Sequence, residues 1–237
     1  MLEIASRNDT DARLWAALRE VCELFSGLPW VLVGGLMVRL LEAEHGRETP
    51  VATIDVDAII DVRAMTLGTR EAAQRLLDHG FQPERPDRET VYRFTRAGDI
   101  VDVLAPDGLG PRADIVTVPP ASTFRTVGGS RALRGRRRLA VSVDATPFEV
   151  PVPDLAGAII IKARAATSAT TSATKHERDL ARLLTLVDHP YEMHDSMSGR
   201  ERGYVWRHRA LTDPGHAAWS QVADAELGSQ NLAVICG

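Results

Sequence analysis

The chain has 237 residues, with 28 Lys and Arg against 32 Asp and Glu and a formal net charge of -4 at pH 7. This length can bury a core in one large or two small domains, and the slight acidic excess excludes a generally basic nucleic-acid-coating protein, so any basic surface must be local. Two cysteines are too few for a disulfide framework or a cysteine-based metal site. Because there is no membrane-length apolar run and no secretory signal, we expect a cytoplasmic protein without membrane contact.

The N-terminal part alternates helical and strand-like patterns. Thr10 or Asp11 is placed to cap a helix that runs to about Leu24, with apolar residues at helical spacing. The segment PWVLVGG (29–35) indicates a short buried strand that ends in two glycines. LMVRLLEAEHG (36–46) then indicates a helix closed by its final glycine.

The next segments continue this alternation. Residues 53–62 alternate as a strand does, with Ile, Val and Ala on one face and the acidic side chains on the other. GTREAAQRLLDHGF (68–81) predicts a helix that ends near Gly80. TVYRFTRAGDIVDVLAPD (90–107) predicts a hairpin with Ala97-Gly98-Asp99 as its turn.

The second half changes from strand-like to helical sequence. A proline-rich VPPAS and an arginine-rich SRALRGRRRL lead into the strand-like LAVSVDATPFEVPVP, and the helical DLAGAIIIKARAAT and SATKHERDLARLLTLV follow. TSATTSAT (167–174) is low in complexity and indicates a mobile loop or a frayed helix end. After His189 we expect irregular and then weakly helical structure. The fold class is α+β, with an N-terminal domain over 1–152 and a mainly helical part over 153–237.

Two aspartates, Asp55 and Asp57, interrupt the buried-looking strand TIDVDAII. Residues two apart on a strand point to the same side, so their carboxylates lie close enough to share a cation. A third acid, Asp102, lies among the apolar residues of DIVDVLAPD, and the three carboxylates converge if the two strands pair. Three oxygen ligands without His or Cys suit Mg²⁺. The alternative is that Asp57 or Asp102 only caps a strand end.

Gly34 and Gly35 follow the first strand and precede a helix. A strand, a glycine turn and a helix N-terminus together form an anion site, because backbone N–H groups and the positive end of the helix dipole face a phosphate. Taken alone, two glycines after a strand often form only a turn. The chain has neither a Walker loop nor a G-x-G-x-x-G motif, which excludes the P-loop and Rossmann sites.

These motifs together resemble the polymerase-β-type nucleotidyltransferase superfamily. The resemblance rests on VGG after a strand, then TIDVDAII, then VDVL, and it covers about residues 31–104. It implies a mixed or antiparallel sheet flanked by helices, with Gly34 and Gly35 at the nucleotide phosphates. It also implies that Asp55, Asp57 and Asp102 hold Mg²⁺, as two ions when the NTP is bound. Many members have Ser where this chain has Gly35.

The helical second half indicates a particular group within this superfamily. IIIKARAA followed by KHERDLARLL is similar to the signature of AbiEii-type nucleotidyltransferases, the group that includes the MenT toxins. This implies that Lys162 contacts the nucleotide phosphates, that Asp179 completes the catalytic site and that Thr53 belongs to the nucleotide site. The alternative is that Lys162 extends to solvent from an apolar helix and that Asp179 forms a surface ion pair with Arg178.

The expected reaction is transfer of a nucleoside monophosphate from an NTP to an acceptor hydroxyl, with Asp102 as the base. The AbiEii and MenT resemblance implies an RNA acceptor, the 3′ end of tRNA, and a toxin that has a cognate antitoxin. One short basic stretch agrees with RNA binding, although it could equally be a solvated hairpin; its members are Arg131, Arg134, Arg136, Arg137 and Arg138. The alternatives are an antibiotic nucleotidyltransferase acting on an aminoglycoside or lincosamide, and a non-catalytic nucleotide- or RNA-binding protein.

Overall fold

The computed structural model describes residues 1–47, 53–168 and 173–237. The first half contains β1 Leu2–Ile4, α1 Asp9–Leu24, β2 Trp30–Val33, α2 Gly34–Glu44, β3 Asp55–Ile60, α3 Gly68–Asp78, β4 Gln82–Pro83, β5 Arg93–Arg96, β6 Asp99–Pro106, β7 Val116–Val118 and β8 Ala121–Ser122. The second half contains β9 Arg125–Thr126, α4 Gly129–Arg134, β10 Arg137–Val143, β11 Thr146–Val152, α5 Leu155–Ser168, α6 Ala173–Leu184, α7 Pro190–Ser196, α8 Gly199–Trp206, the 3₁₀ turns η1 Arg209–Thr212 and η2 Ala217–Trp219, and α9 Ala225–Cys236.

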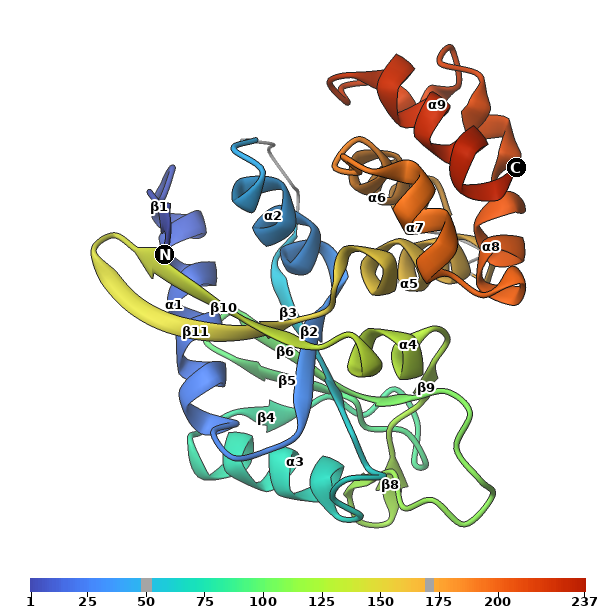
Figure 1. Cartoon of the computed structure of the whole chain (residues 1–237). Helices are drawn as coiled ribbons and strands as arrows, with labels where there is room; N and C mark the ends of the chain where they lie inside the picture. The colour runs from blue at the N-terminus through green and yellow to red at the C-terminus, as the bar shows by residue number, and fades with distance from the viewer. Residues whose placement is uncertain (48–52, 169–172) are drawn as a thin grey trace.

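A mixed sheet forms the centre of the molecule (Figure 1). Its strand order is β2-β3-β6-β5-β4, and the short β9 pairs with the end of β6. Strands β3 and β6 run parallel, whereas β2 is antiparallel to β3 and β5 is antiparallel to β6. Most residues of β3 and β6 are buried, as expected for central strands covered on both faces. The predicted mixed sheet flanked by helices is therefore confirmed.

A second, smaller sheet has the order β1-β10-β11. Its long hairpin passes in front of the central sheet in Figure 1 and packs against β2. The turn is formed by Asp144 and Ala145, which have φ of 47° and 64°. Asp144 is suited to this position because its carboxylate accepts hydrogen bonds from the backbone N–H and the hydroxyl of Ser6, at 2.9 and 2.5 Å.

The C-terminal helices gather at the upper right of Figure 1, beside the end of the sheet where α2 begins. Helix α5 is mostly Ala and Ile and is buried along most of its length, and it packs chiefly against α6. Helix α6 also contacts α2, which connects the helical part to the first βα unit of the sheet. A single cluster of buried apolar side chains extends from Leu14 to Ile235 and so includes both halves of the chain.

The predicted elements over residues 9–168 are present, with local corrections. Helix α1 is capped by Asn8, whose side chain accepts from Asp11 N at 3.0 Å, and not by Thr10 or Asp11. Gly34 and Gly35 are the first residues of α2, not a turn before it. The chain after His189 is more helical than predicted, because it contains α7, α8 and α9. Of the TSATTSAT segment, residues 169–172 lie outside the described residues.

The division at residue 152 stays a prediction. Strand β11 ends at Val152 and α5 begins at Leu155, so the change from strand to helix occurs where the sequence indicated it. Among the residues that the structure describes, no helix is both long and apolar enough to cross a membrane.

Candidate active site

Three carboxylates converge at one end of the β3–β6 pair. In the parallel register Asp57 lies opposite Asp102, and Asp55 precedes Asp57 by two residues on the same side of β3. One carboxylate oxygen of each residue lies within 4.8 Å of the others. The strand pairing thus brings together the three acids that the sequence singled out, although they are as much as 47 positions apart in the chain.

Burial and mutual repulsion perturb these acids. The pKa of Asp57 is raised to about 7, first by burial and then by the charges of Asp55 and Asp102, while the positive charges of Lys162 and Lys175 act in the opposite direction. The pKa of Asp102 is also raised by burial, against which its hydrogen bonds to Arg93 act. Such a cluster requires positive charge to hold all three carboxylates ionised.

The donor set fits a hard divalent cation. Three oxygen ligands at this spacing, without His or Cys, match the preference of Mg²⁺, which keeps other positions for water and phosphate oxygens. The repulsion that raises the pKa of Asp57 is relieved when a cation binds. The side chains are therefore suited to a metal, and the metal's identity belongs to the proposal below.

The two glycines are fixed by contacts with the acidic strand. Gly34 has φ of +74°, and a Cβ there would lie 1.7 Å from Oδ2 of Asp57. A Cβ at Gly35 would lie 2.8 Å from the Cβ of Thr53. A side chain at Gly34 would displace the Asp57 carboxylate and one at Gly35 would displace Thr53, which explains the glycine at both positions. The first N–H groups of α2 therefore lie directly beside the carboxylates, where an anionic phosphate would benefit from the helix dipole.

Thr53 supports the first acid. It is buried, and its Oγ1 donates to Oδ1 of Asp55 at 2.8 Å. This contact fixes the orientation of the Asp55 carboxylate, so Thr53 acts on a site residue from behind the site.

Arg93 is a site residue that the sequence analysis missed. It lies on β5 opposite Asp102 and binds that carboxylate in a two-pronged contact, Nε to Oδ1 and Nη2 to Oδ2, both at 2.8 Å. Its Nη2 also lies 3.4 Å from Oδ2 of Asp55. Arg93 is thus the protein's own cation within the acid cluster. The sequence could have identified Arg93 through the hairpin, because a two-residue turn at Ala97-Gly98 places Arg93 directly opposite Asp102.

Lys162 and Asp179 form a buried ion pair between α5 and α6. Lys162 Nζ donates to Asp179 Oδ2 at 2.6 Å, and the two side chains are only 4% and 3% exposed. Neither expected alternative holds, since Lys162 does not extend to solvent and Asp179 is not at the surface. The positive charge of Lys162 lowers the pKa of Asp57, so the lysine lies near enough to the acid cluster to act on it. Half-buried His176 is close to both members of the pair, since Lys162 helps to lower its pKa.

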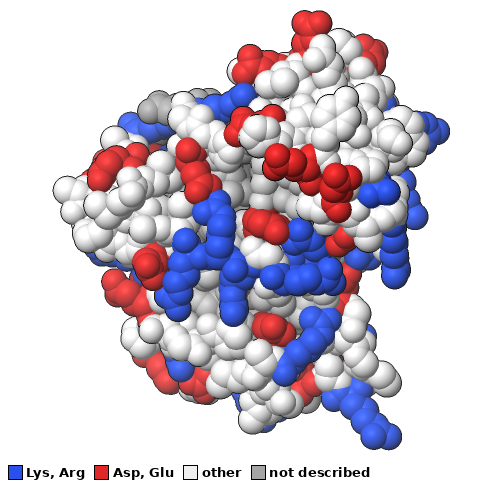
Figure 2. Space-filling view, in the orientation of Figure 1, with Lys and Arg blue, Asp and Glu red and all other residues white. Residues whose placement is uncertain are grey.

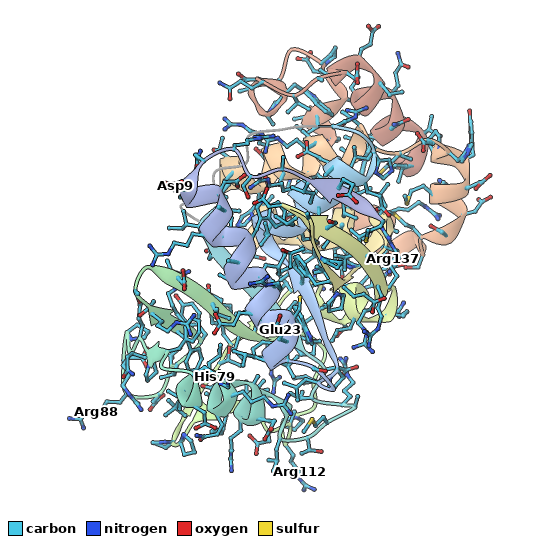
Figure 3. The ribbon with its side chains drawn as sticks, turned by 90° about the vertical axis from the view of Figure 1, so that its left-hand side faces the viewer. Asp9, Glu23, His79, Arg88, Arg112 and Arg137 are labelled. Atoms are coloured by element: carbon cyan, nitrogen blue, oxygen red, sulfur yellow. The ribbon has the colours of Figure 1, made fainter. Side chains whose placement is uncertain are left out.

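The arginine-rich stretch lies elsewhere and is balanced by acids. Arg131 pairs with Asp154 at 2.8 Å, Arg134 faces Glu201 at 3.8 Å, Arg137 binds Glu44 and Arg138 binds Glu149 at 3.0 Å. Arg136 donates to the carbonyl of Trp30, at the opposite end of β2 from the residue that pairs with Asp57. Figure 2 shows a band of basic side chains bordered by acidic ones across the face where Figure 1 places β10 and β11, and Figure 3 labels Arg137 there.

The fold is similar to that of a solved structure. This structure is that of an antigenic nucleotidyltransferase-like protein from Paracoccidioides brasiliensis, with a TM-score of 0.52 and 13% sequence identity over 89% of this chain and 94% of that chain. No protein-family model and no curated protein matches the sequence. The likeness supports a nucleotidyltransferase-like fold.

Proposed function

We propose that the protein transfers a nucleoside monophosphate from an NTP to an acceptor hydroxyl. The observation that carries this proposal is the convergence of Asp55, Asp57 and Asp102 beside the N-terminus of α2, where the Asp57 carboxylate lies directly against Gly34. A catalytically silent binding protein would not need all three acids, and that alternative would gain support if Asp102 lay away from Asp55. The pairing of β3 with β6 argues against it.

Asp55, Asp57 and Asp102 would hold Mg²⁺, as two ions when the NTP is bound. Bound there, Mg²⁺ would supply charge neutralisation at the phosphates and polarisation of the reacting oxygens. The N–H groups of α2 at Gly34 and Gly35 would bind the phosphates, with Thr53 behind them. The positive charges of Lys162 and Lys175 would stabilise the charge that develops on the leaving group, and Asp179 would hold Lys162 in place.

Asp102 would accept the proton of the acceptor hydroxyl. The acceptor oxygen then forms a bond to the α-phosphorus as the bond to the bridging oxygen breaks, and pyrophosphate leaves with the electron pair of that bond. No covalent enzyme intermediate is needed. Arg93 would orient Asp102 through its two hydrogen bonds, so that one oxygen lone pair stays directed at the hydroxyl.

The proposed acceptor is RNA, specifically the 3′ end of tRNA, and the proposed role is that of an AbiEii- or MenT-like cytoplasmic toxin with a cognate antitoxin protein. This part rests on the resemblance of the Lys162 and Asp179 segments to that group. Arg131, Arg134, Arg136, Arg137 and Arg138 stay candidate RNA contacts, although four of them already face a carboxylate.

A small-molecule acceptor is the second candidate. A cavity of about 260 Å³ adjoins Arg93 and is lined by Glu84, Arg85, Pro86 and Tyr92. Its position beside the arginine that holds Asp102 is suited to a hydroxylated acceptor, and Glu84 would favour a cationic antibiotic.

The test is transfer of label from each α-labelled NTP, with Mg²⁺ and total RNA, by the wild type and by the Asp55→Ala variant. We expect label on RNA of tRNA size, lowered at least about 100-fold by Asp55→Ala, because the metal that would neutralise the reacting phosphates loses one of its ligands. Asp9→Ala is the matched control, since Asp9 is an exposed residue in the first turn of α1 and is not a member of the acid cluster. Label only on a small acceptor would select the second candidate, and undiminished transfer by Asp55→Ala would refute the metal site.

A further inference from the structure

Helix α8 presents an arginine cluster that the proposed mechanism does not use. The ring of Tyr204 is surrounded by three guanidinium groups, those of Arg164, Arg200 and Arg207, at 4.6, 5.7 and 5.7 Å from the ring centre. Arg200 Nε also donates to the Tyr204 hydroxyl at 2.6 Å. Trp206, at the end of the same helix, is 43% exposed. Arg200, Trp206 and Arg207 are thus all exposed along one short segment, while Tyr204 is half-buried beneath the guanidinium groups.

Arg164 is paired with Asp107, but the other two arginines around Tyr204 have no acidic partner in the part of the chain that the structure describes. In this, Arg200 and Arg207 differ from Arg131, Arg134, Arg137 and Arg138. The single acid of α8, Glu201, is engaged elsewhere, because it closes the capping box with Ser198 and faces Arg131. Figure 2 shows basic side chains along the right-hand edge, where Figure 1 places α8.

The same surface is connected to the elements that carry the catalytic lysine. His208, two residues beyond Trp206, binds the carbonyl of Ala163 through Nε2 at 2.8 Å and Glu177 through Nδ1 at 3.3 Å. Ala163 follows Lys162 on α5, and Glu177 precedes Asp179 on α6 by two residues. Arg164, on α5 itself, reaches Tyr204. A strand bound along α8 would therefore lie against the helices that hold Lys162.

We propose that the α8 surface, defined as Arg200, Tyr204, Trp206 and Arg207, binds single-stranded RNA and receives the acceptor strand. The inference rests on the proposed nucleotidyl transfer and names its acceptor-binding surface. Unpaired guanidinium groups bind backbone phosphates, and an exposed indole gives a base a face on which to stack. An acidic protein would use the charges but would have no need for the indole.

The test measures binding of a fluorescent single-stranded RNA by anisotropy, without NTP, over a series of salt concentrations. The Arg200→Gln/Arg207→Gln variant should lower affinity about tenfold or more and reduce the slope of log K against log salt by about 1.4, since each phosphate contact on a single strand contributes about 0.7. Trp206→Ala should lower affinity about fivefold or more and leave that slope unchanged.

The matched control is Arg88→Gln/Arg112→Gln, which removes the same charge from two exposed arginines at the lower end of Figure 3. It should bind RNA as the wild type does. An equal loss in the control would overturn the inference, because only net charge would then matter. So would RNA binding unaffected by Trp206→Ala together with equally tight binding of poly-glutamate, which would indicate an acidic protein partner. Because NTP is absent, failure of transfer and failure of this surface are separate results.

Discussion

The acidic and basic sides of the candidate active site are built in different ways. The carboxylates come from two adjacent strands, with Asp57 directly opposite Asp102. The cations come from separate elements, Arg93 from β5, Lys162 from α5 and Lys175 from α6. The acid side therefore depends on the pairing of one pair of strands, whereas the basic side depends on how a hairpin and two helices pack around it. We therefore expect substitutions on the basic side mainly to lower the stability of the fold. Substitutions on the acid side should mainly change the charge repulsion among the carboxylates.

The largest effect on stability is expected at the ion pair between the two helices. Asp179→Asn should lower the free energy of unfolding by about 3–5 kcal/mol, because it leaves the buried Lys162 ammonium without a counter-ion. The double variant Lys162→Met/Asp179→Leu should regain most of that loss, since apolar side chains replace a buried pair at little cost. Urea unfolding of the three proteins measures this.

An assay of nucleotidyl transfer distinguishes a structural role of the Lys162–Asp179 pair from a catalytic role. The double variant should be stable and still inactive if Lys162 serves the phosphates. A double variant that transfers label at the wild-type rate would show that the pair is only structural. Full stability of Asp179→Asn would contradict the buried geometry itself.

The acids could be predicted from sequence because their signal is local. Asp55 and Asp57 show the period of a strand within an apolar run, and Asp102 lies within a second apolar run, on β6. Gly34 and Gly35 were found for the same reason, although the contacts that require glycine, with Asp57 and Thr53, exist only after β3 packs against α2. The strands that carry these residues were enough to predict the central sheet.

The residues of the basic side were harder to predict from the sequence, because their roles depend on contacts with residues far away in the chain. The predicted turn at Ala97-Gly98-Asp99 is one residue longer than the observed turn, in which Arg96 pairs with Asp99 across Ala97 and Gly98. With the longer turn Arg93 would not have lain opposite Asp102, so its role was hidden. The run Arg131–Arg138 attracted attention by composition, but whether an arginine has an acidic partner depends on residues as distant as Glu44.

A smaller effect is expected from charge within the acid cluster. In metal-free protein the pKa of Asp57 is about 7, above its ordinary value of 3.8, so the folded state binds the proton more tightly than the unfolded state. This favours folding below about pH 4, and the advantage is lost as the pH rises towards 7. Asp57→Asn should therefore stabilise the protein at pH 8 in EDTA by roughly 2–4 kcal/mol and flatten the dependence of stability on pH.

Thermal unfolding between pH 4 and pH 8 tests this, with and without Mg²⁺. Mg²⁺ should stabilise the wild type at pH 8 and have little effect on Asp57→Asn. If the variant is no more stable than the wild type in EDTA, the three carboxylates do not repel one another as the geometry indicates.

The smallest effect concerns Arg93, where the two sides of the site meet. Arg93 occupies both oxygens of Asp102 and lies 3.4 Å from Asp55, so a divalent cation must compete with a guanidinium for the same carboxylates. Arg93→Met should raise the affinity of the nucleotide-free protein for Mn²⁺, measured by electron paramagnetic resonance, by about tenfold, equivalent to about 1.4 kcal/mol. Arg93→Lys keeps the charge but loses the two-pronged contact, and it should give an intermediate affinity. If Arg93→Lys binds Mn²⁺ as the wild type does, charge repulsion alone explains the competition.

The control is Arg96→Met, on the same strand but bound to Glu20, which should leave the affinity for Mn²⁺ unchanged. An unchanged affinity in Arg93→Met would mean that Asp55 and Asp57 hold the cation without Asp102, which would leave Asp102 to Arg93 and to the acceptor hydroxyl.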